Sequence, residues 1–389
     1  MAFNFFVPTR ILFGRGQLEN LHVQKFPGKK ALIVISSGKS IRANGYLDRV
    51  EKQLDQAGVE HVVFDKILPN PILTHVQEGA AFAKENGCDF VIGLGGGSTI
   101  DSAKAIAVMA TNDGNFWDYV GSGSGKGKKP EKMPLPIVAI TTTAGTGTEA
   151  DPWTVITNDT TDEKIGSGWD STFPVFSIVD PDLMMTVPPA LTAYQGFDAL
   201  YHSTEGVLNK TASVMSDLFA MKAIELIGGS LAEAVTNGKD ADARANVALA
   251  NTLSGIVEST SGCTSEHSLE HAMSAFHPNL PHGAGLIIIS KAYYTFFAES
   301  GVVNEQLIAM AKALGKSDAE KPIDFVTALV ALQKKCGVDN LKMSDYGVTR
   351  EELPELVKNA RHTMGGLFEV DRVRLTDADC LKIYQDSYR

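Results

Sequence analysis

Strand-like and helix-like segments alternate along the first half of the chain. Continuous apolar runs predict buried strands at residues 30–36, 61–67, 89–95 and 134–140. The stretches between them predict helices at residues 46–57, 74–86 and 98–110. A helix after each strand is the connection that parallel strands require, because a tight turn cannot join them. The pattern therefore predicts an α/β domain with a parallel, doubly wound sheet that helices cover on both faces.

The second half of the chain has a different character. β-Branched runs become rare, and long amphipathic stretches dominate, as at residues 215–235, 241–258 and 302–314. Pro188 and Pro189 mark the change, because proline ends or starts regular elements. We therefore expect two domains, an α/β domain at residues 1–187 and an all-α domain at residues 188–389.

Composition excludes several classes of function. The chain has 389 residues and a net charge of −11, and an acidic chain without a basic stripe binds nucleic acid poorly. No apolar run approaches the roughly eighteen residues that a membrane span needs, and the N-terminus lacks the pattern of a signal peptide. The four cysteines form no CxxC pair. We expect a cytoplasmic protein with reduced thiols and with no nucleic-acid or membrane partner.

Two turns rich in glycine and threonine follow predicted strands. Gly95, Gly96 and Gly97 separate a strand from a helix, and residues 141–149 read TTTAGTGTE. Glycines let the backbone approach a ligand, and a helix N-terminus attracts a pyrophosphate. Ser98 and Asp101 fit a capping box at the helix start. The glycine run at residues 95–97 matches neither the GxGxxG fingerprint nor a P-loop. A plain tight turn between strand and helix therefore remains the alternative. Two such turns at one sheet edge favour a nucleotide site.

A group of histidines and one aspartate have the spacing that is typical of a metal-binding site. Asp198 and His202 are four residues apart, as are His267 and His271, so each pair shares one face of a helix. His282 lies between Pro281 and Gly283, where glycine permits a close approach. Three imidazoles and a carboxylate can enclose Fe²⁺ or Zn²⁺. The alternative is two solvated helix faces and a loop histidine.

Nearly the whole chain resembles the iron-containing (group III) alcohol dehydrogenases. The resemblance is carried by FNFFVPTRILFGRG at 3–16, GGGSTIDSAKAIA at 95–107, TTAGTGTE at 142–149, DPDLMMTVPPALTAYQGFDALYHSTEG at 180–206 and the histidine segment. It implies a dinucleotide-binding N-terminal domain and a metal-binding C-terminal domain. The implied activity is reversible hydride transfer between NAD(P)(H) and a short-chain alcohol or aldehyde, as in butanol, 1,3-propanediol and lactaldehyde reductases. A glycerol-dehydrogenase-like or dehydroquinate-synthase-like enzyme is the alternative on this scaffold.

The resemblance also assigns residues. It implies Asp198, His202, His267 and His282 as metal ligands. It implies that His271 lies beside the nicotinamide, where we expect it to transfer a proton; His277 has no counterpart. The residues that match coenzyme-binding positions are Asn70, Gly95, Gly96, Gly97, Ser98, Asp101, Thr142, Thr143, Thr146 and Lys164.

The segment after the first predicted strand bears on the coenzyme. NAD-preferring relatives place an aspartate there, whereas this chain has Gly38, Lys39, Ser40 and Arg42 and no acid. Hydroxyls and cations would bind a 2′-phosphate that a carboxylate repels. We therefore expect Gly38 and Ser40 to contribute to the coenzyme site and NADP to be favoured over NAD. The resemblance also implies a homodimer or a higher homo-oligomer.

Overall fold

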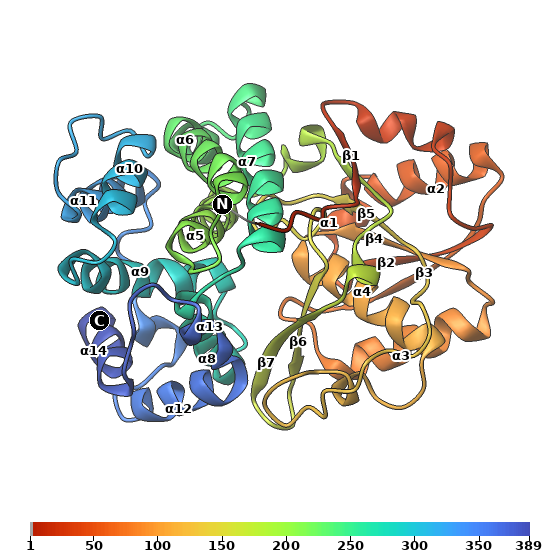
Figure 1. Ribbon diagram of the computed structural model, residues 1–389. Coiled ribbons are helices and arrows are strands. Elements are labelled where there is room, and N and C mark those ends of the chain that lie inside the picture. The colour runs from red at the N-terminus through yellow and green to blue at the C-terminus, as the bar shows by residue number, and fades with distance from the viewer. Residues whose placement is uncertain (1–2) are drawn as a thin grey trace. The chain divides into compact units, whose positions relative to one another are not determined.

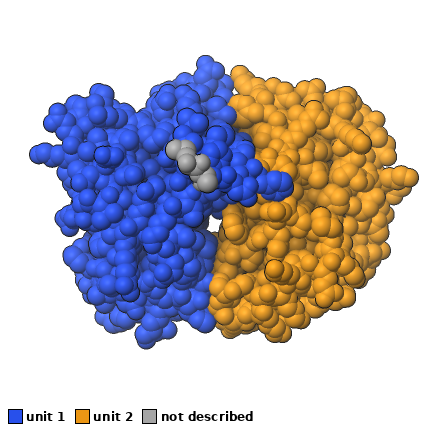
Figure 2. Space-filling view, in the orientation of Figure 1, with its two compact units in different colours: residues 1–6, 144–146, 187–389 blue, residues 7–143, 147–186 orange. Residues whose placement is uncertain are grey.

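The computed structural model describes residues 3–389, which form two compact units (Figure 2). One unit comprises residues 7–143 and 147–186. The other comprises residues 187–389, together with residues 144–146 and residues 3–6. The sequence predicts one boundary, between residues 187 and 188. It does not predict that these two short segments group with the helical unit.

The first unit is built on a six-stranded sheet with the order β1-β8-β5-β4-β2-β3 (Figure 1). Every neighbouring pair of strands is parallel. The strands are β1 (Arg10–Phe13), β2 (Lys30–Ser36), β3 (Glu60–Ile67), β4 (Phe90–Gly95), β5 (Ile137–Thr141) and β8 (Phe176–Val179). The chain runs from β2 to β3 at one edge of the sheet, and from β4 in the opposite direction to β5 and β8. The topological switch point, where such sheets bind ligands, therefore lies between the neighbouring strands β2 and β4.

Alternate side chains of each strand pack on opposite faces of the sheet. Ala31, Ile33 and Ile35 of β2 belong to the core cluster that includes η1 (Gln17–Val23) and α2 (Tyr46–Ala57). Leu32 and Val34 belong to the cluster that includes α3 (Leu73–Glu85) and α4 (Gly97–Thr111). Because both faces are buried, the strands consist of continuous apolar runs. The predicted parallel, doubly wound sheet is confirmed.

Three parts of this unit differ from the sequence prediction. β5 begins at Ile137 and not at residue 134, because Pro134 and Pro136 have no N–H to donate to a neighbouring strand. β1 and β8 were not predicted, since each has only four residues. An antiparallel pair, β6 (Trp153–Asn158) and β7 (Glu163–Gly168), was also not predicted. The short helices are α1 (Ser40–Ala43), η2 (Phe116–Asp118), η3 (Asp170–Thr172) and η4 (Pro181–Met184).

The second unit is helical, as predicted. Residues 187–389 contain no strand, only the isolated bridge between Asn209 and Asp371. The helices are α5 (Pro189–Leu208), α6 (Val214–Thr236), α7 (Ala241–Thr260), α8 (Ser265–Phe276), α9 (His282–Glu299), α10 (Asn304–Ala313), α11 (Ile323–Lys335), η5 (Met343–Tyr346), α12 (Leu353–Met364), α13 (Gly366–Glu369) and α14 (Asp377–Ser387). Among residues 3–389, no helix combines the length and the apolar character that a membrane span requires.

A buried lysine fixes the chain that follows the second glycine turn. Lys104 of α4 is completely buried, and its Nζ is 3.0 Å from Oδ1 of Asp151. The same ammonium donates to Oγ1 of Thr148 at 2.7 Å and to the carbonyl oxygen of Trp153 at 2.8 Å. All three acceptors lie in residues 148–153, so one cation orders the whole segment between the turn and β6. A buried charge is tolerated only with such partners.

We predict that Lys104→Met lowers the free energy of unfolding of this unit by about 3–5 kcal/mol, because it leaves the buried Asp151 carboxylate without a counter-charge. Urea unfolding followed by tryptophan fluorescence measures this unit alone, since Trp117, Trp153 and Trp169 all belong to it. Lys128→Met is the matched control, because that side chain is 58% exposed. Equal unfolding midpoints for the two variants would contradict the prediction.

Candidate functional site

Three helices of the helical unit bring the four predicted metal ligands together. Asp198 and His202 lie one turn apart on α5, and His267 lies in the first turn of α8. His282 is the first residue of α9, after Pro281 as N-cap. Proline suits this place because its fixed φ precedes a helix without strain and its missing N–H is not needed there.

The Asp198 carboxylate lies at the centre of this cluster. Its Oδ1 atom is 3.8 Å from Nε2 of His202, 3.6 Å from Nε2 of His267 and 3.4 Å from Nε2 of His282. Ligand atoms bound tetrahedrally about 2.0–2.2 Å from one ion are about 3.3–3.6 Å from each other. The separations of Asp198 from His267 and His282 therefore fit a single divalent metal ion, and these three residues form one group of possible ligand atoms. His202, at 3.8 Å, lies slightly outside that range and groups with His267 and Cys263.

Each of these three imidazoles has an oxygen acceptor beside Nδ1. The acceptors are the carbonyl of Gly145 for His202, at 3.3 Å, the carboxylate of Glu205 for His267 and the carboxylate of Glu270 for His282. Carbonyl and carboxylate oxygens only accept, so in the neutral rings the proton lies on Nδ1 and the lone pair on Nε2. The rings are thus in the tautomer that ligation through Nε2 requires.

Two atoms of the cluster lack partners. Asp198 Oδ1 and His267 Nε2 are buried, and neither has a hydrogen-bond partner within residues 3–389. Burial raises the pKa of Asp198, but the neighbouring His202 and His282 outweigh it and hold that pKa well below its usual value. Burial lowers the pKa of His202 to about 3, which keeps this ring neutral. Burial lowers the pKa of His267, but the neighbouring Cys263, Glu205 and Asp198 outweigh it and hold that pKa well above its usual value. With that ring deprotonated, one carboxylate and three imidazoles form a donor set that fits Fe²⁺ or Zn²⁺.

Two glycines of α9 make room for this geometry. A Cβ atom at Gly283 would lie 2.1 Å from the carbonyl oxygen of Tyr194 on α5. A Cβ atom at Gly285 would lie 2.7 Å from Oε1 of Glu270. Gly283 therefore permits the close approach of α9 to α5 that the sequence predicted beside His282, and Gly285 leaves space for the carboxylate that orients that ring.

His271 and His277 lie outside this set. The His271 ring is 5.2 Å from the His282 ring, and its Nδ1 is 2.9 Å from Sδ of Met364. His277 follows the last residue of α8, and its Nε2 contacts the Glu352 carboxylate. No cluster of possible ligand atoms in the described chain includes His277. The geometry therefore favours His282 over His277 as the fourth ligand.

Sequence reasoning missed several residues around the metal site. Glu205 follows Asp198 and His202 at the i, i+4, i+7 spacing of one helical face, and Glu270 is three residues after His267. These spacings could have predicted that both carboxylates lie beside the candidate ligands. Cys263 lies four residues before His267, which is the spacing of one helix face, but the sequence interpretation was a small buried hydrophobic residue; it precedes the start of α8. Its thiol is within 4.8 Å of possible ligand atoms of His202 and His267. Burial raises the pKa of this thiol well above its usual value, which keeps it protonated.

The two turns predicted to bind a nucleotide lie in contact. β4 and β5 are neighbours, with Gly95 opposite Thr141, and the N–H of Thr142 donates to the Gly95 carbonyl at 2.9 Å. A Cβ atom at Gly96 would lie 2.9 Å from Oγ1 of Thr143. Glycine is therefore required where the turns meet. They share the carboxyl edge of the sheet, where α/β sheets bind nucleotides.

The predicted capping box of α4 is wrong. Gly96 is the N-cap residue, so Ser98 is already the second residue of the helix and lies too far along it to cap. The Asp101 carboxylate instead accepts from Oγ1 of Thr148 at 2.7 Å and from the N–H of Val155 at 2.9 Å. No side chain of the described residues caps the helix start, which leaves its N–H groups suited to an anion.

Three other candidate coenzyme residues are distributed over the two units. Lys164 of β7 donates from Nζ to Oδ1 of Asn70 at 3.1 Å, so these two residues of the α/β unit are in contact. Thr146 belongs to the three-residue segment that groups with the helical unit. These contacts do not test whether the three residues bind the coenzyme, so that role stays a prediction.

The segment after β2 lines a pocket of about 420 Å³. Gly38, Lys39 and Arg42 contribute to its wall, as does Asp65 from β3. The guanidinium of Arg42 is 2.8 Å from the Asp65 carboxylate. Ser40 is the first residue of α1. The pocket therefore contains two cations and one acid, and the acid comes from a strand that sequence reasoning did not connect with this segment.

We predict that Gly283→Ala weakens metal binding, because the added methyl group must displace the backbone that carries His282. Chelator competition followed by metal analysis measures the affinity, and we expect a loss of about 10- to 100-fold, as when a residue that orients a ligand is changed. Gly229→Ala on α6 is the matched control, since nothing lies within 4 Å of its added Cβ. Equal affinities in the two variants would contradict the prediction.

The chain matches two family models. The model described as iron-containing alcohol dehydrogenase matches residues 8–181. The model described as the C-terminal part of the Fe-containing alcohol dehydrogenase family matches residues 192–388. The two together cover most of both units.

Named relatives agree with these matches. Alcohol dehydrogenase 4 of Saccharomyces cerevisiae (strain YJM789) is 33% identical over 99% of this chain and 98% of its own length. The NAD-dependent methanol dehydrogenase of Bacillus methanolicus is 33% identical over 92% of this chain and 93% of its own. The crystal structure of the archaeal halo-thermophilic Red Sea brine pool alcohol dehydrogenase ADH/D1 is similar with a TM-score of 0.95 and 35% identity, covering 100% of this chain and 99% of that one. The chain therefore belongs to the iron-containing alcohol dehydrogenase family.

Proposed function

We propose that this protein interconverts a short-chain alcohol and its aldehyde. Membership of the family makes it an oxidoreductase that acts on alcohols with a nicotinamide coenzyme. The observation that carries the proposal is the convergence of three imidazole Nε2 atoms on Asp198 Oδ1 at 3.4–3.8 Å. Asp198, His202, His267 and His282 would hold a metal ion that supplies Lewis acidity toward the substrate oxygen, and a bound nicotinamide would supply or accept the hydride.

The residues of the chain have separate tasks in this proposal. Asp198 and the three imidazoles bind the ion, while Glu205 and Glu270 hold two of those rings in the required tautomer. His271 lies beside the His282 ring and takes up the proton that alcohol oxidation releases. In the reverse direction the same imidazole returns a proton to the oxygen of the product.

We propose Fe²⁺ as the resident ion. The name of the family supports iron, and a donor set of three imidazoles and one carboxylate also accepts Zn²⁺. Glycerol-dehydrogenase-like or dehydroquinate-synthase-like chemistry is not favoured, because both matching family models are described as those of the Fe-containing alcohol dehydrogenases.

We propose NADP(H) as the preferred coenzyme. Between Ser36 and Arg42 the chain has no acid to accept hydrogen bonds from a ribose, and the pocket there presents Lys39 and Arg42. A 2′-phosphate would accept from both cations. Asp65 opposes this preference, since its carboxylate pairs with Arg42. The Bacillus methanolicus relative is named NAD-dependent, so the preference rests on the residues of this chain alone.

We propose that the enzyme works in the cytoplasm as a homodimer or a higher homo-oligomer. The four cysteines are unpaired, which suits a reducing compartment. Phe3, Phe5 and Phe6 are 39–51% exposed near the start of the chain, and an exposed apolar surface of this kind favours self-association.

For the coenzyme, we expect the iron-loaded protein to oxidise NADPH faster than NADH when butanal is added under anaerobic conditions. Lys39→Asp should lower kcat/KM for NADPH by about 10- to 100-fold, which corresponds to the roughly 1.5–3 kcal/mol of a hydrogen bond to a charged group. Lys66→Asp is the control, because it exchanges a different exposed lysine of the same unit. Better use of NADH by the unchanged protein would exclude the NADP preference and leave the reaction class intact.

For the ligands, we expect His267→Ala and His282→Ala to lose the metal ion, because each removes one of four donors. His277→Ala should retain it, since that ring contacts Glu352. His271→Ala should also retain it but lower kcat by about 10²-fold or more, as expected for a lost acid–base group. Metal analysis after gel filtration, together with aldehyde-dependent NADPH oxidation, separates these cases. Full occupancy in His282→Ala would exclude this residue as the fourth ligand.

A further inference from the structure

Asp65 reaches the pocket beside the segment after β2 because of an irregularity in the sheet. The register between β2 and β3 shifts after Val34, so that β3 has one residue more than β2 over this stretch. A bulge of this kind turns side chains out of the regular alternation between the two faces of a sheet. Asp65 and Lys66 of β3 are accordingly both exposed, between the buried Phe64 and Ile67.

The two exposed residues of this bulge have partners on different helices. Nζ of Lys66 is 2.7 Å from Oε2 of Glu78 on α3. Oδ2 of Asp65 accepts from Nη2 of Arg42 on α1 at 2.8 Å. The bulge therefore directs a carboxylate, and not the neighbouring ammonium, to the pocket of about 420 Å³ that Lys39 and Arg42 also line.

The positive charges of this pocket are only partly compensated. Among residues 3–389 the Lys39 ammonium has no hydrogen-bond or ion-pair partner, and the Arg42 guanidinium has one, the Asp65 carboxylate. Both side chains of that pair are 53% exposed, and an exposed ion pair contributes little free energy. A phosphate can therefore replace the carboxylate beside Arg42 at a small cost.

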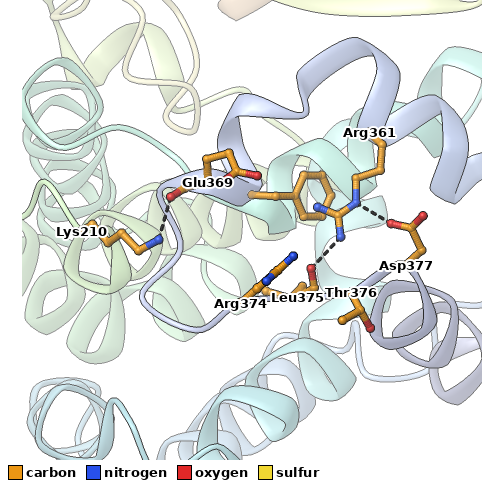
Figure 3. A pocket seen from close by; sticks show the side chains of 8 residues that line it. Lys210, Arg361, Glu369, Arg374, Leu375, Thr376 and Asp377 are labelled. Atoms are coloured by element: carbon orange, nitrogen blue, oxygen red, sulfur yellow. Dashed lines mark hydrogen bonds and ion pairs between the residues drawn. The ribbon is translucent and has the colours of Figure 1, made fainter.

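A second pocket shows how a cation that belongs to the fold differs from Arg42. Arg361, on the wall of a pocket of about 560 Å³, donates to the Asp377 carboxylate at 2.9 Å and to the Leu375 carbonyl at 2.7 Å (Figure 3). Its guanidinium also lies 3.8 Å from the centroid of the Phe368 ring, and only 25% of the side chain is exposed. These contacts commit Arg361 to the fold, whereas Arg42, with one exposed partner, is available to a ligand.

The carboxylate and the two cations of the smaller pocket have opposite effects on the two coenzymes. NADP carries a phosphate at the 2′ position of the adenosine ribose, where NAD carries a hydroxyl. A hydroxyl can donate to a carboxylate, whereas a phosphate is repelled by it and accepts from guanidinium and ammonium groups. Asp65 therefore offers an acceptor to NAD, and it also engages one of the two cations that a 2′-phosphate would use.

We propose that Asp65 is a specificity-determining residue that shifts the coenzyme preference of this protein toward NAD(H). Its carboxylate accepts from the ribose hydroxyl of NAD(H) and competes with the 2′-phosphate of NADP(H) for Arg42, so the pocket binds both coenzymes. The inference deepens the proposed function and rests on the proposed placement of the adenosine ribose in this pocket. The acid comes from the strand beside β2, and the segment that follows β2 has none.

The binding of two nucleotides tests this proposal without catalysis. 2′,5′-ADP carries the 2′-phosphate of NADP, and 5′-AMP carries the hydroxyl of NAD. Asp65→Asn keeps the size of the side chain and removes its charge. We expect it to lower Kd for 2′,5′-ADP about tenfold and to raise Kd for 5′-AMP about threefold, as expected for one hydrogen bond to a charged group. Isothermal titration calorimetry measures both constants.

Asp55→Asn is the matched control, because it removes the same charge from a 73% exposed side chain of α2 in the same unit. We expect it to change neither Kd. The ratio of the two Kd values is the decisive quantity. An equal ratio in Asp65→Asn and in the unchanged protein would overturn the proposal.

An Arg42→Met background tests whether Asp65 acts through Arg42. If the carboxylate competes for this guanidinium, Asp65→Asn should improve 2′,5′-ADP binding much less in that background than in the unchanged protein. The gain should also shrink at an ionic strength of about 1 M, where the Debye length is about 3 Å. A merely structural role predicts no such salt dependence. An equal gain in both backgrounds would exclude the competition.

The outcomes separate this inference from the proposed function. If neither Lys39→Met nor Arg42→Met changes Kd for 2′,5′-ADP, the pocket is not the adenosine site. The inference then fails, while aldehyde reduction by the iron-loaded protein still decides the reaction class. If Arg42→Met weakens 2′,5′-ADP binding but Asp65→Asn leaves the ratio unchanged, the site is right and the role of Asp65 is wrong. If the unchanged protein prefers NADH, the shift in Asp65→Asn still decides that role.

Discussion

The buried carboxylate of Asp198 is the constraint on which the candidate site depends. A carboxylate taken out of water without a counter-charge costs several kcal/mol, and Asp198 Oδ1 has no hydrogen-bond partner in the described chain. The carboxylates of Glu205 and Glu270 are also fully buried nearby, and the imidazole of His267, whose pKa is held well above its usual value, does not by itself compensate for three negative charges. A divalent cation does, so the feature that is least favourable in the empty protein is the one that metal binding stabilises.

The contacts around Asp198 show what each helix contributes to the candidate site. α5 supplies both Asp198 and Glu205, so one rigid element carries a ligand and the group that orients His267. α8 supplies His267 and Glu270, and Glu270 orients the ring at the start of α9. α5 and α8 thus each contribute to a neighbour's candidate ligand as well as their own. Small displacements of one helix would therefore reach the next, because packed helices have little room to relax.

The sequence predicted the parts of this arrangement that depend on local spacing. The alternation of strands and helices predicted the sheet, and the two four-residue intervals predicted which side chains share a helix face. It did not predict contacts that join distant segments. The Ser98–Asp101 pair had the spacing of a capping box, yet the Asp101 carboxylate bonds to Thr148 and Val155, more than 40 residues away. Local spacing cannot exclude a stronger distant partner.

The two histidines of α8 also show that local spacing alone cannot assign roles within the candidate site. His267 and His271 have the same residue type, helix and face, and nothing in their spacing assigns one to the metal and the other to the proton. The difference lies in their Nδ1 partners, Glu205 at a separation of 62 residues and Met364 at a separation of 93. A carboxylate beside Nδ1 strengthens an imidazole as a metal ligand, whereas a thioether is only a weak acceptor. The helix therefore determines where each ring lies, and the contacts that would distinguish the two rings come from distant parts of the chain, beyond the reach of local spacing.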